Sequence, residues 1–459
     1  MITYIKINGF KSFHHFEMEF TPFTVVAGAN ASGKSNLFDA LKLLGRLAET
    51  DNLKKAFKEQ RGEFIELFTQ YGENHYATEI EFAVEMLVNR KVKDAWGNES
   101  ELKYTRLRYE LKIKRFTNSL GIEDLIVTNE HLENLKPKED KWIKLLPKGK
   151  LENWCPNVNR VRTVFYLKTE TETEIPTVLV SQDGVRGVQK RRFPLLKATR
   201  TVLSSFDTVD FPHVLGAKEE MRGWKFLQLN PADLRQPTHK NTVADVISES
   251  GQNLAAVLHR IKQEDIYTLK EISREFQTFL PNFVDVNVVD ETENKQYLIK
   301  LKDKDKKEYT SRVVSEGTLR ILALCILKYD NKHSGLLCFE EPENGIHPFH
   351  LETMAKLLKS LSVDFTDIEM PLRQVIVNTH SSVLVSLMNR WAPDNLLSIW
   401  YAEIRNRITD IQNNRVKLSV TSILPVIKEK YVQLMLSFSD QEKKLTLSKL
   451  KKYLETASN

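Results

Sequence analysis

The stretch "FTVVAGANASGKSNLFDALKLLGRL", residues 23–47, decides the fold of this chain. A short apolar run typical of a buried strand leads into a glycine-rich loop, and an amphipathic helix follows. The loop "GANASGKS" (28–35) fits the phosphate-binding pattern G-x-x-x-x-G-K-[ST], in the strand–loop–helix context that this pattern requires. A chance glycine turn before a helix is the alternative, but the correct elements on both sides favour phosphate binding.

Each residue type in this loop has a physical task. Gly28 and Gly33 let the backbone curl so that successive N–H groups face one anion, and the helix N-terminus adds its partial positive charge. Lys34 is expected to reach the β- and γ-phosphates, and the Ser35 hydroxyl to coordinate Mg²⁺. Asn30 lies where its side chain could touch the γ-phosphate or the attacking water. The loop therefore predicts a triphosphate bound with Mg²⁺.

A second stretch, "GLLCFEEPENGIHP" (335–348), places Glu340 and Glu341 side by side at the end of a predicted buried strand. Neighbouring carboxylates repel each other, and burying each one is costly unless a cation compensates. A magnesium ion held by Ser35 and Glu340 would supply that cation, and Glu341 could then polarise a water molecule. The paired acids thus fit the metal that the loop predicts.

Two further motifs complete a set of four. "SEGT" (315–318) opens an apolar helix, where a serine and a glycine can form an anion site, and "RQVIVNTHSSVLV" (373–385) is a buried strand that ends at His380. Alone, the first is explained as an ordinary helix cap and the second as a structural histidine. Their order along the chain, after the phosphate loop and around the paired acids, favours a role in one site.

In this order the four motifs resemble those of the ATP-binding-cassette head domains in the SMC, RecF and OLD group of AAA-family ATPases. "GANASGKSN" resembles their Walker A motif, "SEGTLR" their signature, "LLCFEEPENGIHP" their Walker B motif, and "VNTHSS" their switch histidine. The resemblance spans nearly the whole chain. Two positions depart from the pattern: Val314 precedes Ser315 where leucine is usual, and Glu340 replaces the aspartate of transporter cassettes.

The resemblance implies ATP and Mg²⁺ as cofactors and gives each motif residue a role. Ser35 and Glu340 would hold the metal, Glu341 would be the general base, and His380 would sense the γ-phosphate. Ser315 and Gly317 would act on ATP bound by a second subunit, which implies a homodimer or a higher homo-oligomer. A glutamine often completes such sites, and Gln60 and Gln70 are both possible. The implied ATP-binding residues are Gly28, Asn30, Gly33, Lys34, Ser35 and Asn36.

The predicted fold class is α/β: a head with a mixed sheet, combining a RecA-like parallel core and N-terminal antiparallel strands, plus a helical lid and a central insertion. No heptad repeat is sustained long enough for the coiled-coil arms of SMC proteins. The expected units are an N-terminal ATPase lobe (1–135), an irregular insertion (136–240), the helical lid (241–282), a C-terminal ATPase lobe (283–405) and a C-terminal helical extension (406–459).

Bulk composition sets the class of protein and its compartment. The chain has 459 residues with 41% hydrophobic content, which supports real cores, and no apolar run is long enough to span a bilayer. The three cysteines have no metal-binding or disulfide spacing, so the cytoplasm is the expected location. The net charge of +6 permits a nucleic-acid partner without requiring one.

Together these features predict an oligomeric ATPase that scaffolds or regulates a separately encoded effector. Chains of this shape resemble the ATPase components of bacterial anti-phage systems such as Septu and PARIS, whose effectors are nucleases. We expect no nuclease activity in this chain, because nothing after His380 has the length or the acids of an appended nuclease. The alternatives are a RecF-like clamp that binds DNA for repair, and a scaffold that holds ATP without hydrolysing it.

Overall fold

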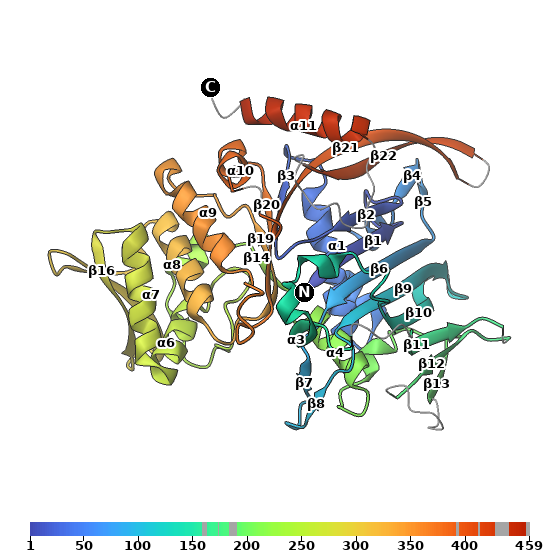
Figure 1. Ribbon diagram of the computed structural model, residues 1–459, viewed down its shortest axis with the longest axis horizontal. Helices are drawn as coiled ribbons and strands as arrows, with labels where there is room; N and C mark the ends of the chain where they lie inside the picture. The colour runs from blue at the N-terminus through green and yellow to red at the C-terminus, as the bar shows by residue number, and fades with distance from the viewer. Residues whose placement is uncertain are drawn as a thin grey trace.

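A six-stranded sheet lies at the centre of the computed structural model, which describes residues 1–157, 163–172, 174–182, 191–391, 394–411, 414–426 and 440–455 (Figure 1). The neighbouring strands, in order, are β14 (Lys225–Leu227), β19 (Gly335–Glu340), β20 (Arg373–Thr379), β3 (Phe23–Ala27), β21 (Leu397–Ile411) and β22 (Asn414–Pro425). The first five pair in parallel, and β22 turns back against β21. Every residue of β3 and β20 is buried, as expected of parallel strands covered on both faces.

Alternate residues of these strands face two different cores. Leu336, Cys338 and Ile376 join the core that contains α1 (Lys34–Glu49) and α4 (Pro212–Arg222). Their neighbours in sequence, Leu337, Phe339 and Val377, join the second core. That core contains α8 (Glu316–Tyr329), α9 (Leu351–Ser360) and α10 (Ser382–Asn389). The central sheet is therefore packed by helices on both faces.

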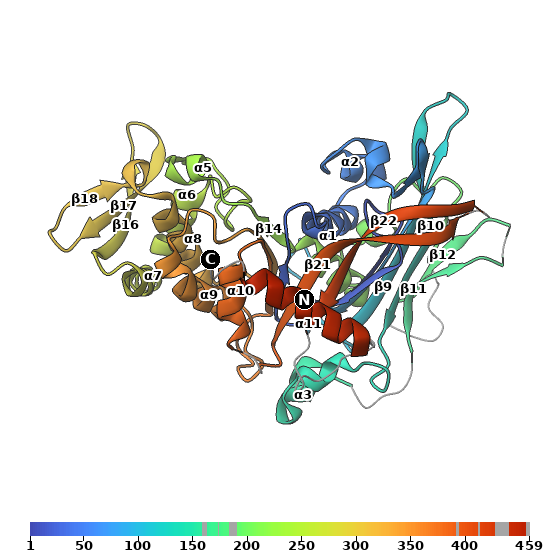
Figure 2. The same ribbon diagram turned by 90° about the horizontal axis from the view of Figure 1, so that it is seen from above.

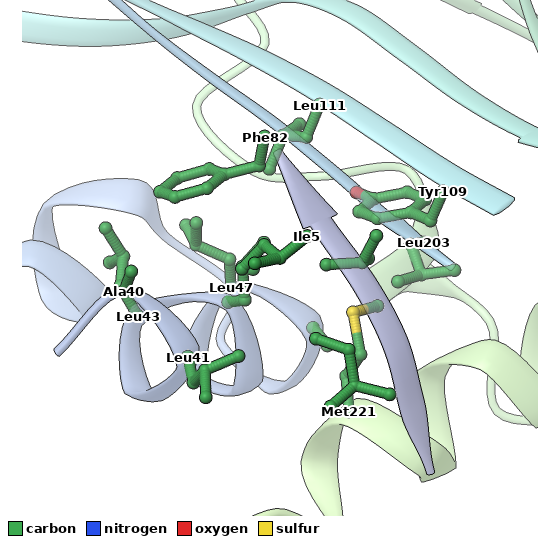
Figure 3. Packing of buried hydrophobic residues seen from close by; sticks show 14 of the residues in the cluster. Ile5, Ala40, Leu41, Leu43, Leu47, Phe82, Tyr109, Leu111, Leu203 and Met221 are labelled. Atoms are coloured by element: carbon green, nitrogen blue, oxygen red, sulfur yellow. The ribbon is translucent and has the colours of Figure 1, made fainter. Parts of the chain in front are cut away.

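A second, antiparallel sheet of eight strands covers the far side of α1. Figure 3 shows α1 packed through Ala40, Leu43 and Leu47 near Ile5 and Phe82 of that sheet, with Met221 of α4 beside them. The sheet thus fixes the helix that begins in the phosphate loop. Its strands, in order, are β13 (Arg191–Pro194), β12 (Thr177–Val180), β11 (Phe165–Glu170), β10 (Glu123–Asn134), β9 (Arg106–Thr117), β6 (Glu79–Leu87), β1 (Ile2–Asn8) and β2 (Phe16–Glu19).

The opposite lobe carries a small third sheet. Strand β17 (Gln296–Asp303) pairs with β15 (Thr238–His239), β16 (Phe283–Glu291) and β18 (Glu308–Thr310). Helices α6 (Leu254–Glu264) and α7 (Ile266–Phe279) pack on this sheet, and α7 also packs on α8 (Figures 1 and 2). The remaining elements are short: α2 (Leu53–Lys58), α3 (Leu151–Trp154), α5 (Pro231–Arg235), and the hairpins β4 (Gln70–Gly72) with β5 (His75–Tyr76) and β7 (Lys91–Lys93) with β8 (Glu99–Glu101).

The mixed α/β fold predicted from the sequence is confirmed, with its parallel core and antiparallel strands. Two expectations about segments were wrong. The span 136–240 is not an irregular insertion, since it supplies β11 to β13, helix α4 and the edge strand β14. The span 406–459 is not wholly a helical extension, since its first part completes the β21–β22 hairpin and, among its described residues, the helix is α11 (Asp440–Glu455). In the described part of the chain, no helix has the length and apolarity needed to cross a membrane.

A buried carboxylate ties the antiparallel sheet to the turn before α4. Glu130 is fully buried, and it accepts hydrogen bonds from the backbone N–H groups of Val202 (2.6 Å) and Leu203 (2.7 Å) and from the Tyr109 hydroxyl (3.0 Å). Burial raises the pKa of Glu130 to about 7, and these three hydrogen bonds oppose the rise. Because the folded state holds this proton up to about pH 7 and the unfolded state releases it near pH 4.5, folding becomes less favourable as the pH rises between those values.

We expect Glu130→Gln to remove this pH dependence. In the wild-type chain the Glu130 contribution to the free energy of unfolding should be largest below pH 4.5 and fall by an amount on the order of 3 kcal/mol as the pH passes 7. Urea unfolding curves at pH 5 and pH 7.5 measure the difference for both proteins. Equal pH slopes for the two proteins would show that Glu130 titrates alike in the folded and unfolded states.

Candidate nucleotide-binding site

The glycines of the loop between β3 and α1 are required by close packing of the β21–β22 hairpin. A Cβ on Gly28 would lie 2.5 Å from the Ala402 carbonyl oxygen, and one on Gly33 would collide with the Thr421 hydroxyl. Gly33 also has a φ of 86°, a left-handed conformation that side chains disfavour. The hairpin therefore shapes the loop from one side (Figure 2).

Lys34 sits at the centre of the loop. Its ammonium group donates hydrogen bonds to the carbonyl oxygens of Gly28 (2.7 Å) and Ala29 (2.8 Å), and the side chain is buried. Burial lowers the pKa of Lys34, and the nearby carboxylates of Glu341, Glu343 and Glu340 act in the opposite direction. The lysine predicted to bind phosphate therefore feels the negative charge of all three acids.

The first acid of the pair contacts the serine of the loop. Ser35 Oγ donates a hydrogen bond to Glu340 Oε1, and the Asn378 amide nitrogen lies 3.4 Å from each of these two oxygens. The parallel pairing of β19 with β20, and of β20 with β3, brings these distant positions to one sheet edge. A hydroxyl and a carboxylate so placed suit Mg²⁺, which commonly binds one or two protein oxygens and completes its shell with phosphate and water.

The second acid meets the predicted switch histidine. Glu341 Oε1 lies 2.9 Å from His380 Nδ1, and Glu341 Oε2 accepts a hydrogen bond from the Asn344 side chain at 2.8 Å. Glu341 has a positive φ of 47°, and its backbone N–H donates to the Asn378 carbonyl at 2.8 Å. Strained backbone held by such contacts is common at functional sites.

Asn30 of the loop and Asn36 of α1 have different surroundings. Asn30 is exposed on the loop. Asn36 donates a hydrogen bond to Ser12 Oγ (2.8 Å), and Ser12 in turn contacts Thr421 at 2.5 Å between hydroxyl oxygens. Asn36 therefore links α1 to the turn after β1 and to the hairpin.

The signature residues lie on the surface of the opposite lobe. Ser315 is exposed and caps α8 by accepting a hydrogen bond from the Thr318 backbone N–H at 3.3 Å. A Cβ on Gly317 would lie 2.6 Å from the Gly345 carbonyl oxygen, so the start of α8 touches the turn after the paired acids. Neither residue lines the cavities beside Glu340, so they do not complete the site within one chain.

The sequence does not distinguish between Gln60 and Gln70 as the glutamine that completes the site, and the structure adds a third candidate. Gln60 is buried beside Glu340, and Gln70 lines a separate cavity of about 650 Å³ with Asn36. Gln228 directly follows β14, the strand that pairs with β19, and lines a cavity of about 890 Å³ with both paired acids. Sequence reasoning missed Gln228 because β14 has only three residues and lies in a segment expected to be irregular.

Arg61 was also missed, since no motif marks it. Its guanidinium group donates two hydrogen bonds to Asp39 of α1, at 3.1 and 2.9 Å, and these bonds raise the pKa of Arg61. The side chain remains largely exposed and lines the 890 Å³ cavity with Glu340 and Glu341. Arg61 thus adds a positive charge opposite the paired acids.

Gly33→Ala should destabilise the fold by about 2 kcal/mol or more. Alanine would have to adopt the left-handed backbone conformation of this position, and its Cβ would collide with Thr421. Thermal unfolding measures the loss, and Thr421→Ala in the same chain should restore part of it. Gly149→Ala is the matched control, since a Cβ there meets nothing within 4 Å. A Gly33→Ala protein as stable as this control would contradict the packing described.

Solved structures of Smc heads are similar to this chain. One similar solved structure is an Smc head bound to the C-winged helix domain of ScpA, with 15% identity, a TM-score of 0.50, and coverage of 94% of this chain and 98% of that chain. Another is an Smc head domain with an extended coiled coil bound to the C-terminal domain of ScpA, derived from Pyrococcus furiosus, with 12% identity, a TM-score of 0.45, and coverage of 100% and 99%. The first likeness shows a shared fold.

Among curated proteins, no sequence matches this chain. The model of the family described as "AAA domain, putative AbiEii toxin, Type IV TA system" matches residues 23–386, which run from β3 into α10 and include all four motifs. The chain therefore belongs to this family of AAA domains, with an ATPase-like fold similar to that of Smc heads.

Proposed function

We propose that this chain binds ATP with Mg²⁺ and hydrolyses it. The observation that supports this most strongly is the meeting of Ser35 with Glu340, residues that stand 305 positions apart in the sequence. The Glu341–His380 pair is already formed beside them at 2.9 Å. A glycine turn that arose by chance before a helix would not be expected to place its serine against one acid, with a second acid and a histidine paired next to it.

In this proposal each side chain acts on a defined part of the nucleotide. Lys34 and the loop N–H groups bind the phosphates, and Ser35 and Glu340 would hold Mg²⁺, which when bound supplies charge neutralisation for the phosphates. Glu341 orients a water molecule and accepts its proton, while His380 holds Glu341 and contacts the γ-phosphate. Gln228 and Arg61, which line the adjoining cavity, contribute contacts from the opposite wall.

Glu341→Gln should retain ATP binding and slow turnover by about 10²- to 10⁴-fold, because the amide cannot accept the proton. Phosphate release under saturating ATP and Mg²⁺ measures turnover, and fluorescent ATP titration measures binding. Lys34→Ala is the companion variant and should lose binding with an unchanged melting temperature. Hydrolysis by Glu341→Gln at the wild-type rate would exclude this residue as the base, and an inactive wild type that binds ATP would favour the non-hydrolysing scaffold.

We further propose that the site is completed by a second copy of the chain. Ser315 and Gly317 start a helix whose N-terminus is open to solvent and can receive the phosphates of a nucleotide bound elsewhere. Two large apolar side chains in these neighbouring segments are exposed: Val313 (72%), shortly before Ser315, and Phe349 (81%), shortly after the Walker B turn. The Gly317–Gly345 approach joins both segments into one surface, which suits a protein interface.

Phe349→Asp should abolish nucleotide-dependent oligomers, because it places a charge in the proposed interface. Mass photometry of this variant in the Glu341→Gln background, with and without ATP, measures the effect. Trp96→Asp is the control, since Trp96 is similarly exposed (70%) on the β7–β8 hairpin of the other lobe. An ATP-dependent oligomer that survives Phe349→Asp would place the interface elsewhere.

The partner we propose is a separately encoded effector, a nuclease, in bacterial anti-phage defence. The description of the matched family, a putative AbiEii toxin of a toxin–antitoxin system, supports this direction. The three cysteines are buried free thiols, as suits a reducing cytoplasm. Mixing the chain with the product of the neighbouring gene in the same mass measurement tests the partnership. Association with DNA alone, weakening steeply with salt, would instead favour the RecF-like clamp.

A further inference from the structure

A third acid in the Walker B turn, Glu343, has no role in the site as described so far. It follows Glu341 by two positions, and only 9% of it is exposed. Glu343 Oε1 accepts a hydrogen bond from the Thr379 hydroxyl at 2.5 Å, while within the described residues nothing hydrogen-bonds to the buried Oε2. A carboxylate this deeply buried with one oxygen unsatisfied is costly to the fold.

Structural needs alone do not explain a charge here. A glutamine at this position would still accept the Thr379 hydrogen bond through its amide oxygen, and it would avoid burying a charge. Glu340 and Glu341 lie close enough that all three acids act on the same Lys34 ammonium group. A third negative charge therefore adds repulsion in the absence of nucleotide, so its benefit must come from another group nearby.

That group is His380. Glu343 Oε1 lies 3.7 Å from His380 Nδ1, on the nitrogen that also faces Glu341 Oε1 at 2.9 Å. Both residues that flank the histidine in sequence are tied to the same carboxylate. Thr379 donates to it directly, and the Ser381 backbone N–H donates to the Thr379 hydroxyl at 2.9 Å. Ser381 in turn caps α10 by accepting from the Leu384 N–H at 3.2 Å.

We infer that Glu343 is a positioning residue that fixes the orientation of His380. Its carboxylate anchors the end of β20 through Thr379, and its charge draws His380 Nδ1 toward the acids. The imidazole is then turned so that Nε2 is the nitrogen presented to the nucleotide. This inference rests on the proposed ATP hydrolysis, in which His380 contacts the γ-phosphate and holds Glu341.

The test is a double-mutant cycle with Glu343→Gln and His380→Ala in the full-length chain. Glu343→Gln should lower kcat by about tenfold, as loss of a supporting partner typically does, and leave the KM for ATP nearly unchanged. If Glu343 acts through His380, the double variant should be no slower than His380→Ala alone. If the fold loss of kcat in the double variant equals the product of the two single losses, the inference is wrong.

Stability provides a second readout that a merely structural residue would not give. Because Glu343→Gln removes a buried charge and keeps the Thr379 hydrogen bond, its melting temperature should stay equal to the wild type or rise by about 2 °C. A fall in melting temperature together with the loss of kcat would identify Glu343 as a structural residue. Glu352→Gln, which removes an exposed acid of α9 that forms an ion pair with Lys356, is the matched control and should change neither quantity.

The result separates this inference from the function on which it rests. The proposed function is established first, if the wild type hydrolyses ATP and the rate falls in Glu341→Gln. A wild-type rate in Glu343→Gln would then overturn the role of Glu343 alone. Thr379→Val keeps the charge beside His380 and removes both hydrogen bonds of the Thr379 hydroxyl, the one to Glu343 and the one from the Ser381 N–H. A loss of kcat smaller than that of Glu343→Gln would therefore assign the larger share to the charge.

Discussion

The register of three buried parallel strands is the constraint on which the candidate site depends. Glu340 of β19 pairs with Asn378 of β20, and Thr379 of β20 pairs with Ala27, the last residue of β3. Because parallel strands end at the same sheet edge, this register alone places the acids, the switch histidine and the phosphate loop together. A shift by one residue would reverse the face of every side chain in the strand and move the apolar residues out of their two cores.

Local patterns predicted the motifs well and the connections between them poorly. The phosphate loop and the paired acids follow buried strands whose composition is unmistakable, so the amino-acid sequence alone was enough to assign both. By contrast, β11 to β13 are short strands of mixed composition, and their place in a sheet depends on neighbours far along the chain. The same reason hid Gln228, whose position is defined only by the pairing of β14 with β19. The alternating residues of β22, from Arg415 to Thr421, carried a strand signal that was available in the sequence.

The protein treats buried carboxylates in two opposite ways. Glu130 has three hydrogen-bond donors around it and fastens two parts of the fold. In the site, three carboxylates share one buried lysine, and that lysine donates to carbonyl groups of its own loop. The hydrogen bonds to Glu130 offset part of the cost of burying it, whereas the three acids of the site leave negative charge uncompensated until cations and a ligand arrive. Ligand and cation binding would then be strengthened by neutralising this charge, while the unliganded protein is less stable because of it. Many active sites show this trade between stability and function.

The turn after the paired acids links the chemistry of the site to the surface of the molecule. A Cβ on Gly345 would lie 2.6 Å from the Glu316 side chain, and one on Gly317 would meet the Gly345 carbonyl, so the start of α8 and this turn have no space to move independently. The same turn carries Glu341 and Glu343, which hold His380. A subunit that docks on the signature helix would therefore press on the backbone that positions the base and the histidine. In the proposed function, coupling of assembly to hydrolysis would need no long pathway, because one tight turn would belong to both the proposed interface and the candidate site.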